Sequence, residues 1–170
     1  MVCGGIVSYI EAKENANVSI IDVINHADID ANNNNIDLGG ILGQVGISSD
    51  PISQDYVAQR EWNSGATIES VPLLRTISLT MDGCINRGDL YSSESWAGDA
   101  GGLIGSVNYL KALNIDDCST QGVSNEEMVK IGYTTSGQLI SSAGGLVGVI
   151  QDVASINIEM SESNIPNYYT

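Results

Sequence analysis

One stretch of the chain, DIDANNNNID at residues 28–37, carries side-chain oxygens at regular intervals. Asp28, Asp30, Asn32 and Asn34 stand at every second position, and Asp37 follows them. Carboxylate and amide oxygens are the ligands that Ca²⁺ takes in proteins. The glycine and the final glutamate of an EF-hand loop are missing from their required positions. The stretch therefore predicts one of two things: a calcium site of another kind, or a solvated loop whose asparagines accept left-handed backbone.

Two of the three cysteines occupy the same position in two similar strings. Cys84 lies in LTMDGCINRGDL and Cys118 lies in LNIDDCSTQGV. If these strings form neighbouring strands about 4.8 Å apart, the two thiols are close enough for a disulfide. The alternative is a ladder of free buried thiols that pack as small apolar groups. Neither a zinc site nor a redox CxxC pair fits the spacing of the three cysteines.

The candidate binding residues are aromatic side chains in or near the segments that interrupt the regular pattern of the chain. They are Tyr56, Trp62, Tyr91 and Trp96. Inserted segments of this kind often carry binding surfaces. The alternative is that the helix with Tyr56, Val57 and Trp62 plugs or flanks the core. The tripeptide at 87–89, Arg-Gly-Asp, has the form of a receptor-adhesion signal. Turn chemistry already accounts for its glycine and aspartate, so we expect a turn there.

A catalytic centre is harder to assemble from this sequence. His26 is the single histidine, and one histidine supplies neither a metal cluster nor a triad with partners around it. Pairs such as Asp82 with Asp89, or Asp116 with Asp117, have the carboxylates that glycoside hydrolysis needs. A chain with 21 acidic residues contains such pairs by chance. We therefore expect a non-catalytic protein, with a carbohydrate-active enzyme as the alternative.

Composition narrows the class of protein. The formal net charge is -15, which argues against nucleic acid and anionic membranes as partners, because both need clustered cations. Apolar residues make up 42% of the 170 residues, which is enough for one domain with a core. No apolar run is long enough to span a membrane. The 19 glycines and abundant asparagine and serine are typical of a β-rich chain with many turns.

Internal repeats organise the whole chain. A Gly-Gly-aliphatic string occurs four times, as CGGIVS (3–8), LGGILGQV (38–45), AGGLIGSV (100–107) and AGGLVGVI (143–150). A second string follows each one, as VSIIDVINHADI (18–29), LTMDGCINRGDL (79–90), LNIDDCSTQGV (113–123) and the weaker INIEMSESNI (156–165). Aliphatic residues alternate with polar ones in the second string, which predicts a strand with one buried face. Paired glycines suit either a positive φ or a close approach of backbone.

These repeats predict an all-β fold, a parallel β-solenoid (β-helix) of three to four repeats that forms one domain over 1–170. One unit cannot bury its apolar face alone, whereas stacked units share a continuous core. The insert 47–66 has helical signals, with Asp50 as N-cap before Pro51, and the shorter 124–130 has a capping-box pattern. The open ends of such a stack favour end-to-end self-association.

The strings GGLVG (144–148), GGLIG (101–105) and GGILG (39–43), together with CINRGDL and VINHADI, resemble the GLUG-motif repeat family. That resemblance implies a module of a larger bacterial protein that is secreted or attached to the cell surface. It also implies an adhesin-like or structural role without assigned catalytic residues.

The resulting expectation is a non-catalytic repeat module that displays a binding surface on a rigid scaffold. A host glycan or a host surface protein is the expected partner, without nucleic acid or membrane insertion. No cofactor is expected apart from calcium. A spacer without a ligand is a second alternative to the binding module.

Overall fold

The protein is all-β wherever its structure is described. The computed structural model describes residues 2–12, 15–31, 37–46, 75–92, 98–121, 129–130 and 142–163. Nineteen strands lie in these segments and form five sheets, in which every pairing is parallel. None of these segments contains a helix, and hence none contains one that could cross a membrane.

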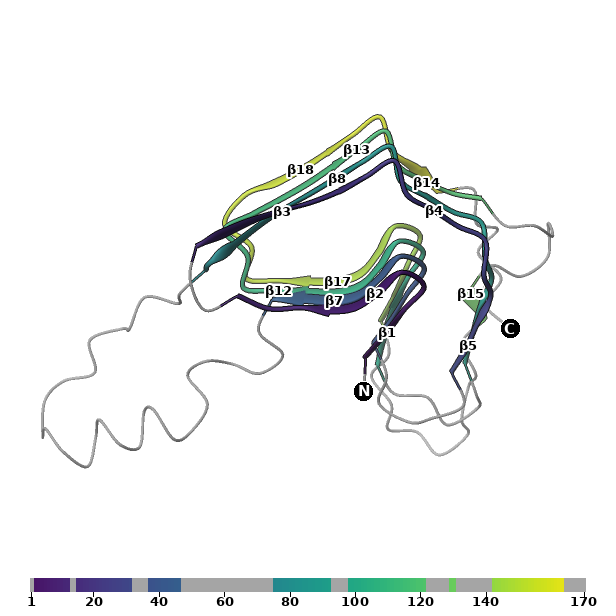
Figure 1. Ribbon diagram of the computed structural model, residues 1–170. Helices are drawn as coiled ribbons and strands as arrows, with labels where there is room; N and C mark the ends of the chain where they lie inside the picture. The colour runs from purple at the N-terminus through teal and green to yellow at the C-terminus, as the bar shows by residue number, and fades with distance from the viewer. Residues whose placement is uncertain are drawn as a thin grey trace, which may run out of the picture.

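Each sheet combines strands that are far apart in the sequence (Figure 1). Sheet A contains β1 (Val2–Gly4), β6 (Asp37–Gly39), β11 (Asp99–Gly101) and β16 (Ser142–Gly144). Sheet B contains β2 (Val7–Ile10), β7 (Leu42–Gly46), β12 (Ile104–Asn108) and β17 (Val147–Gln151). Sheet C contains β3 (Ala16–Ile21), β8 (Ile77–Asp82), β13 (Ala112–Asp116) and β18 (Ile156–Glu159). Sheet D contains β4 (Ile24–Asn25), β9 (Ile85–Asn86), β14 (Ser119–Thr120) and β19 (Glu162–Ser163), and sheet E contains β5 (Ile29–Ala31), β10 (Leu90–Ser92) and β15 (Val129–Lys130).

The chain passes through the sheets in the same order each time, which defines four structural repeats. Repeat 1 comprises β1–β5, repeat 2 β6–β10, repeat 3 β11–β15 and repeat 4 β16–β19. The register agrees with the alignment of the sequence strings. Gly39 pairs with Gly4 and Gly101, and Leu79 pairs with Val18 and Leu113. The predicted all-β class and the parallel pairing of the repeats are therefore confirmed.

The apolar core lies between sheets B and C. Alternate residues of sheet C point inward, so Leu79, Met81, Leu113 and Ile115 are fully buried. They pack against the inward side chains of sheet B in one cluster, which includes Leu42, Val45, Ile104 and Val107. A smaller cluster joins sheets A and E through Ile29, Leu38, Leu90 and Ala100. Phenylalanine is absent from the sequence, and neither cluster includes an aromatic side chain from the described part of the chain.

The paired glycines are explained by close packing and not by unusual backbone angles. Among the described glycines, a positive φ occurs at Gly46 and Gly83, which lie outside the pairs. A Cβ on Gly40 would collide with the carbonyl oxygen of Gly102 in the next repeat and with the side chain of Asn86. The second glycine of the first three pairs thus lets sheet A turn into sheet B directly against sheet D.

The residue that each of these glycines faces is a buried polar group. Gly5 faces Asn25, Gly40 faces Asn86, and Gly102 faces Thr120. The three polar residues are register neighbours in sheet D.

The two asparagines form a hydrogen-bonded ladder between repeats. Asn25 Nδ2 donates to Asn86 Oδ1 at 2.9 Å. Each amide also closes its own turn: Asn86 Nδ2 donates to the carbonyl oxygen of Gly88 at 2.9 Å, and Asn86 Oδ1 accepts from the Gly88 backbone N–H at 3.2 Å. Asn86 is fully buried, and these bonds satisfy its amide. The Asn in the string INRGD is thus required by the turn that follows it.

Two helical predictions have different outcomes. The insert at 47–66 lies outside the described residues. In the shorter insert, Val129 and Lys130 form β15, so the prediction of a helix over 124–130 is wrong at these two positions. They pair with Leu90 and Tyr91, and hydrogen bonding to sheet E outweighs the local capping signal.

Gly40→Ala should destabilise the protein by about 3 kcal/mol, since the added methyl group meets backbone on one side and a buried amide on the other. Ser19→Ala, at an exposed position of β3, serves as the control and should change the free energy of unfolding by less than about 0.5 kcal/mol. Urea denaturation followed by circular dichroism measures both. Equal stabilities of the two variants would contradict the packing explanation of the paired glycines.

Candidate functional site

The most regular chemical feature of the outer surface is a ladder of carboxylates at the end of sheet C. Asp82, Asp116 and Glu159 are register neighbours in three successive repeats, and all three are exposed. We call these three residues the acidic ladder. Neighbouring parallel strands are about 4.8 Å apart, so the ladder is a row of like charges at that spacing. Such rows are destabilising for a sheet and are tolerated best where water screens them.

The backbone fixes the place of the acidic ladder. The residue after each carboxylate of the acidic ladder has left-handed backbone, with φ of 60° at Gly83, 46° at Asp117 and 45° at Met160. Asp22 has the same conformation in repeat 1, with φ of 54°. This corner turns the chain from sheet C into sheet D in every repeat. The acidic ladder therefore runs along an edge of the molecule.

A second carboxylate pair lies at the start of sheet A. Asp37 and Asp99 are the first residues of β6 and β11, and the residues that follow them are paired in register. Ser106 Oγ donates to Asp37 Oδ2 at 2.7 Å. Partial burial, together with the charge of Asp37, raises the pKa of Asp99, and hydrogen bonds from Ser142 oppose this rise. Sequence reasoning missed Asp99, although it stands two positions before a Gly-Gly pair, as Asp37 does.

The predicted calcium ligands are only partly described. Asn32 and Asn34 lie outside the described residues, and Asp30 is exposed on β5. Asp28 Oδ1 accepts from the backbone N–H of Asp89 at 2.8 Å, which holds repeat 1 against repeat 2. Among the described residues, no three His, Cys, Asp or Glu side chains gather in a group that could hold a metal ion. The calcium site stays a prediction.

The Arg-Gly-Asp tripeptide lies in the turn between β9 and β10. Asp89 is 7% exposed, and its Oδ2 accepts from the hydroxyl of Tyr91 at 2.9 Å. Its Oδ1 is buried and has no hydrogen-bond partner among the described residues. A receptor that reads this tripeptide needs access to the carboxylate, and the fold encloses it. The tripeptide is part of the repeat turn, as the sequence predicts.

Of the four candidate aromatic residues, one is described. Tyr91 lies half-buried on β10, where its hydroxyl donates to Asp89. Tyr56, Trp62 and Trp96 lie outside the described residues. The binding role of these four side chains stays a prediction.

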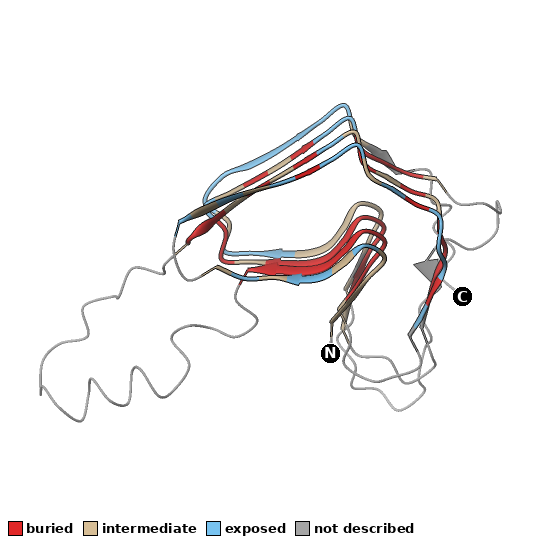
Figure 2. Cartoon of the chain, in the orientation of Figure 1, coloured by how far each residue is buried: buried red, intermediate tan, exposed pale blue. Residues whose placement is uncertain are grey.

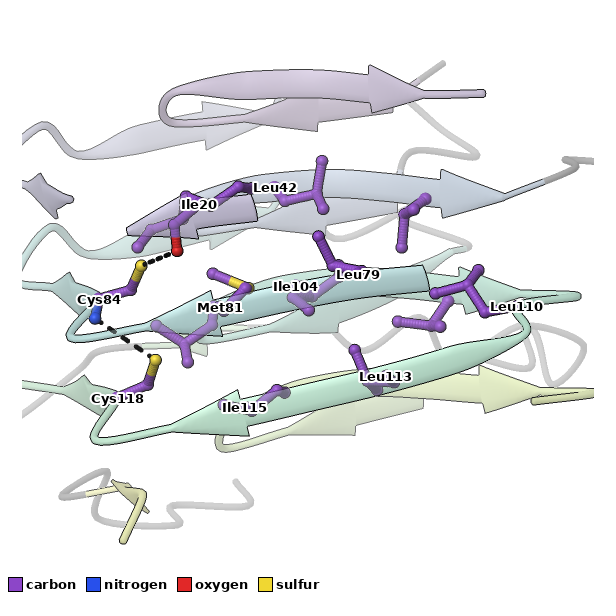
Figure 3. Packing of buried hydrophobic residues seen from close by; sticks show 14 of the residues in the cluster. Ile20, Leu42, Leu79, Met81, Cys84, Ile104, Leu110, Leu113, Ile115 and Cys118 are labelled. Carbon is purple, nitrogen blue, oxygen red and sulfur yellow. Dashed lines mark hydrogen bonds between the residues drawn. The ribbon is translucent and has the colours of Figure 1, made fainter. Parts of the chain in front are cut away.

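Cys84 and Cys118 lie at equivalent places in neighbouring repeats (Figure 3). The disulfide between them stays a prediction, as does the ladder of free thiols. Cys84 and Cys118 are buried, and the backbone N–H of Cys84 lies 3.4 Å from Cys118 Sγ. In repeat 4 the same position is Ser161, whose Oγ accepts from the backbone N–H of Cys118 at 3.2 Å. The hydrogen bond between the two thiols lowers the pKa of Cys84 and, with burial, raises that of Cys118.

No protein-family model matches the chain, and neither a curated protein nor a solved structure is significantly similar to it. The resemblance to GLUG repeats therefore rests on the motif strings themselves.

Asp99→Asn should stabilise the protein at neutral pH, by no more than about 1 kcal/mol because the site is only half-buried. The pKa of Asp99 in the folded protein is raised above the ordinary value of 3.8, so the folded state binds its proton more tightly than the unfolded state. The stabilisation that comes from the protonated Asp99 is therefore fully present below pH 3.8. It is lost as the pH rises through the pKa that Asp99 has in the folded protein.

Urea denaturation from pH 3 to pH 8 measures this dependence, and the variant should lack that decline. Asp30→Asn removes the same charge from an exposed position and corrects for the change in net charge. If the free energy of unfolding depends on pH in the same way in both variants, the decline cannot be attributed to Asp99.

Thiol titration in denaturant without reductant should find three free thiols per chain, because Cys3, Cys84 and Cys118 are all unpaired. Cys84→Val should be well tolerated, at a cost below about 1.5 kcal/mol, because repeat 1 has Val23 at this position. A single free thiol in the wild type would instead establish the disulfide.

Proposed function

We propose that this chain is a non-catalytic display module of a secreted or cell-surface bacterial protein. In this proposal the five sheets form a parallel β-solenoid whose coils are the four repeats, and the repeats belong to the GLUG type. The support is the agreement between the motif strings and the strand register, since every Gly-Gly pair stacks on the next.

The observation that carries the proposal is the acidic ladder. A stack of in-register strands places equivalent side chains at a constant spacing along a rigid edge. A partner that contacts one carboxylate of the ladder can contact the next ones without a further loss of translational freedom. Several weak contacts can therefore combine into a useful affinity. The negative charge of the ladder favours a host surface protein with clustered lysine and arginine over an anionic glycan.

The carboxylate pair Asp37–Asp99 favours a second candidate, a carbohydrate-active enzyme. Glycoside hydrolysis uses two carboxyl groups whose environments hold one protonated and the other ionised. The raised pKa of Asp99 beside Asp37, which accepts from Ser106, has this character. A spacer that holds other domains away from the cell surface needs neither the pair nor the ladder.

Binding to host cells and to arrays of glycans and surface proteins separates these functions. We expect defined protein hits that weaken at high salt, and at least tenfold weaker binding after Asp82→Asn, Asp116→Asn and Glu159→Gln are combined. The matched control combines Glu11→Gln, Asp30→Asn and Asp152→Asn, which remove as many charges from exposed positions off the ladder.

The other outcomes contradict the display function in different ways. Release of sugar products that is abolished by Asp99→Asn would establish the enzyme. An array without hits, from protein that is folded, would establish the spacer.

A further inference from the structure

The two ends of the stack are more exposed than its middle (Figure 2). They also expose large apolar side chains. All the large apolar residues that are exposed in the described part of the chain belong to repeats 1 and 4. They are Ile6, Tyr9, Ile21 and Ile24 in repeat 1, and Ile150, Ile156, Ile158 and Met160 in repeat 4.

Repeat 4 exposes positions that belong to the core elsewhere. Ile156 and Ile158 are 50% and 43% exposed, whereas their register partners Leu113 and Ile115 in repeat 3 are fully buried. The inward side chains of sheet C are thus buried in repeats 2 and 3 but exposed to solvent in repeat 4.

The backbone is open at the same places. Strands β1 to β5 each lie at one edge of their sheet, and β16 to β19 lie at the opposite edges. Because every pairing is parallel, the free edge of repeat 4 offers the hydrogen-bonding groups that the free edge of repeat 1 needs. The two ends are complementary halves of the interface that already joins repeat 1 to repeat 2 and repeat 3 to repeat 4.

We propose that these ends join two copies of the chain head to tail, with repeat 4 of one copy stacked in register on repeat 1 of the next. Continuing the register places Ile156 beside Val18 and Ile158 beside Ile20 of the second copy. This contact completes the core ladder of sheet C in both copies.

The charges agree with this register. Acids of one end fall opposite uncharged side chains of the other, whereas inside the chain the acidic ladder stacks acid on acid. The pairs across the junction are Glu159 with Ile21, Met160 with Asp22, and Gln151 with Glu11.

Such a junction is heterologous and leaves a free end on every complex. Association therefore proceeds beyond a dimer to filaments, since nothing closes the ring. The net charge of -15 opposes association at low salt. Raising the salt from 0.1 M to 1 M shortens the screening length from about 10 Å to about 3 Å and should strengthen it.

Sedimentation velocity over concentrations up to about 1 mM, at both salt levels, measures the association, and electron microscopy detects the filaments. The wild type should show a mass that rises continuously with concentration and more steeply at high salt.

Ile21→Glu sets a carboxylate against Glu159 of the next copy and should weaken association at least tenfold. Adding Glu159→Lys to Ile21→Glu should restore it. Thr80→Glu adds the same charge on the same sheet in repeat 2 and should have no effect, and melting curves confirm that each variant is folded.

Three results would overturn the proposal. One is a wild type that stays monomeric under all these conditions, which would mean that another segment covers the ends. Another is a closed dimer that does not grow. The third is association that Ile21→Glu leaves unchanged or that Glu159→Lys does not rescue.

Discussion

In-register stacking of parallel strands is the constraint on which the rest of this structure depends. Each residue of an inner repeat lies about 4.8 Å from the equivalent residues of both neighbours, so every position must be compatible with copies of itself. Inward positions satisfy this with aliphatic side chains, as in the row of Val18, Leu79, Leu113 and Ile156. Polar interior positions satisfy it with Asn25 and Asn86, because an amide donates to the next amide and accepts from its own turn.

The same constraint makes charged positions costly, and the molecule handles them in two ways. The acidic ladder is exposed, so water and salt screen its repulsion. At Asp37 and Asp99 burial is greater, and there the hydroxyl of Ser106 and the groups of Ser142 offset part of the repulsion. Features that cost stability and recur in the same place are where function is best sought. A rigid row of charges suits the display function, and the partly buried pair is the feature that keeps an enzymatic role in view.

Stacking also explains why the ends are chemically different from the middle. A repeat in the middle has a neighbour on both sides, so its core residues and its backbone groups are covered. Repeats 1 and 4 each lie at one edge of the sheets, and the exposed Tyr9 and Ile158 follow from this, because their register partners Gln44 and Ile115 are buried. The acidic ladder and the proposed junction share Glu159, which would lie beside Ile21 of the next copy. A filament would therefore carry one acidic ladder per copy, and the uncharged Ile21 would separate each ladder from the next.

The alternating strands of sheet C and the alignment of the four repeats can be predicted from the amino-acid sequence alone. A period-two pattern identifies which residues of β3 or β8 face inward, and the recurring Gly-Gly strings align the repeats without any knowledge of the fold. The period-two pattern is a local signal, and the recurring strings are found by comparing one segment of the sequence with another. The helical signal at 124–130 was equally local, and it was wrong at Val129 and Lys130 because sheet E pairs them with a distant strand.

The contacts across the interior and the surroundings of each side chain cannot be read from these patterns and follow from the folded structure. The contact of Gly40 with Asn86 joins sheet A to sheet D, and the sequence places these residues 46 positions apart with no shared pattern. The burial of Asp89, the nearness of Asp37 to Asp99 and the open row at Ile156 likewise depend on how one repeat closes and which neighbours it has. Burial is a property of the whole stack, whereas alternation is a property of one strand, and this is the physical reason for the division.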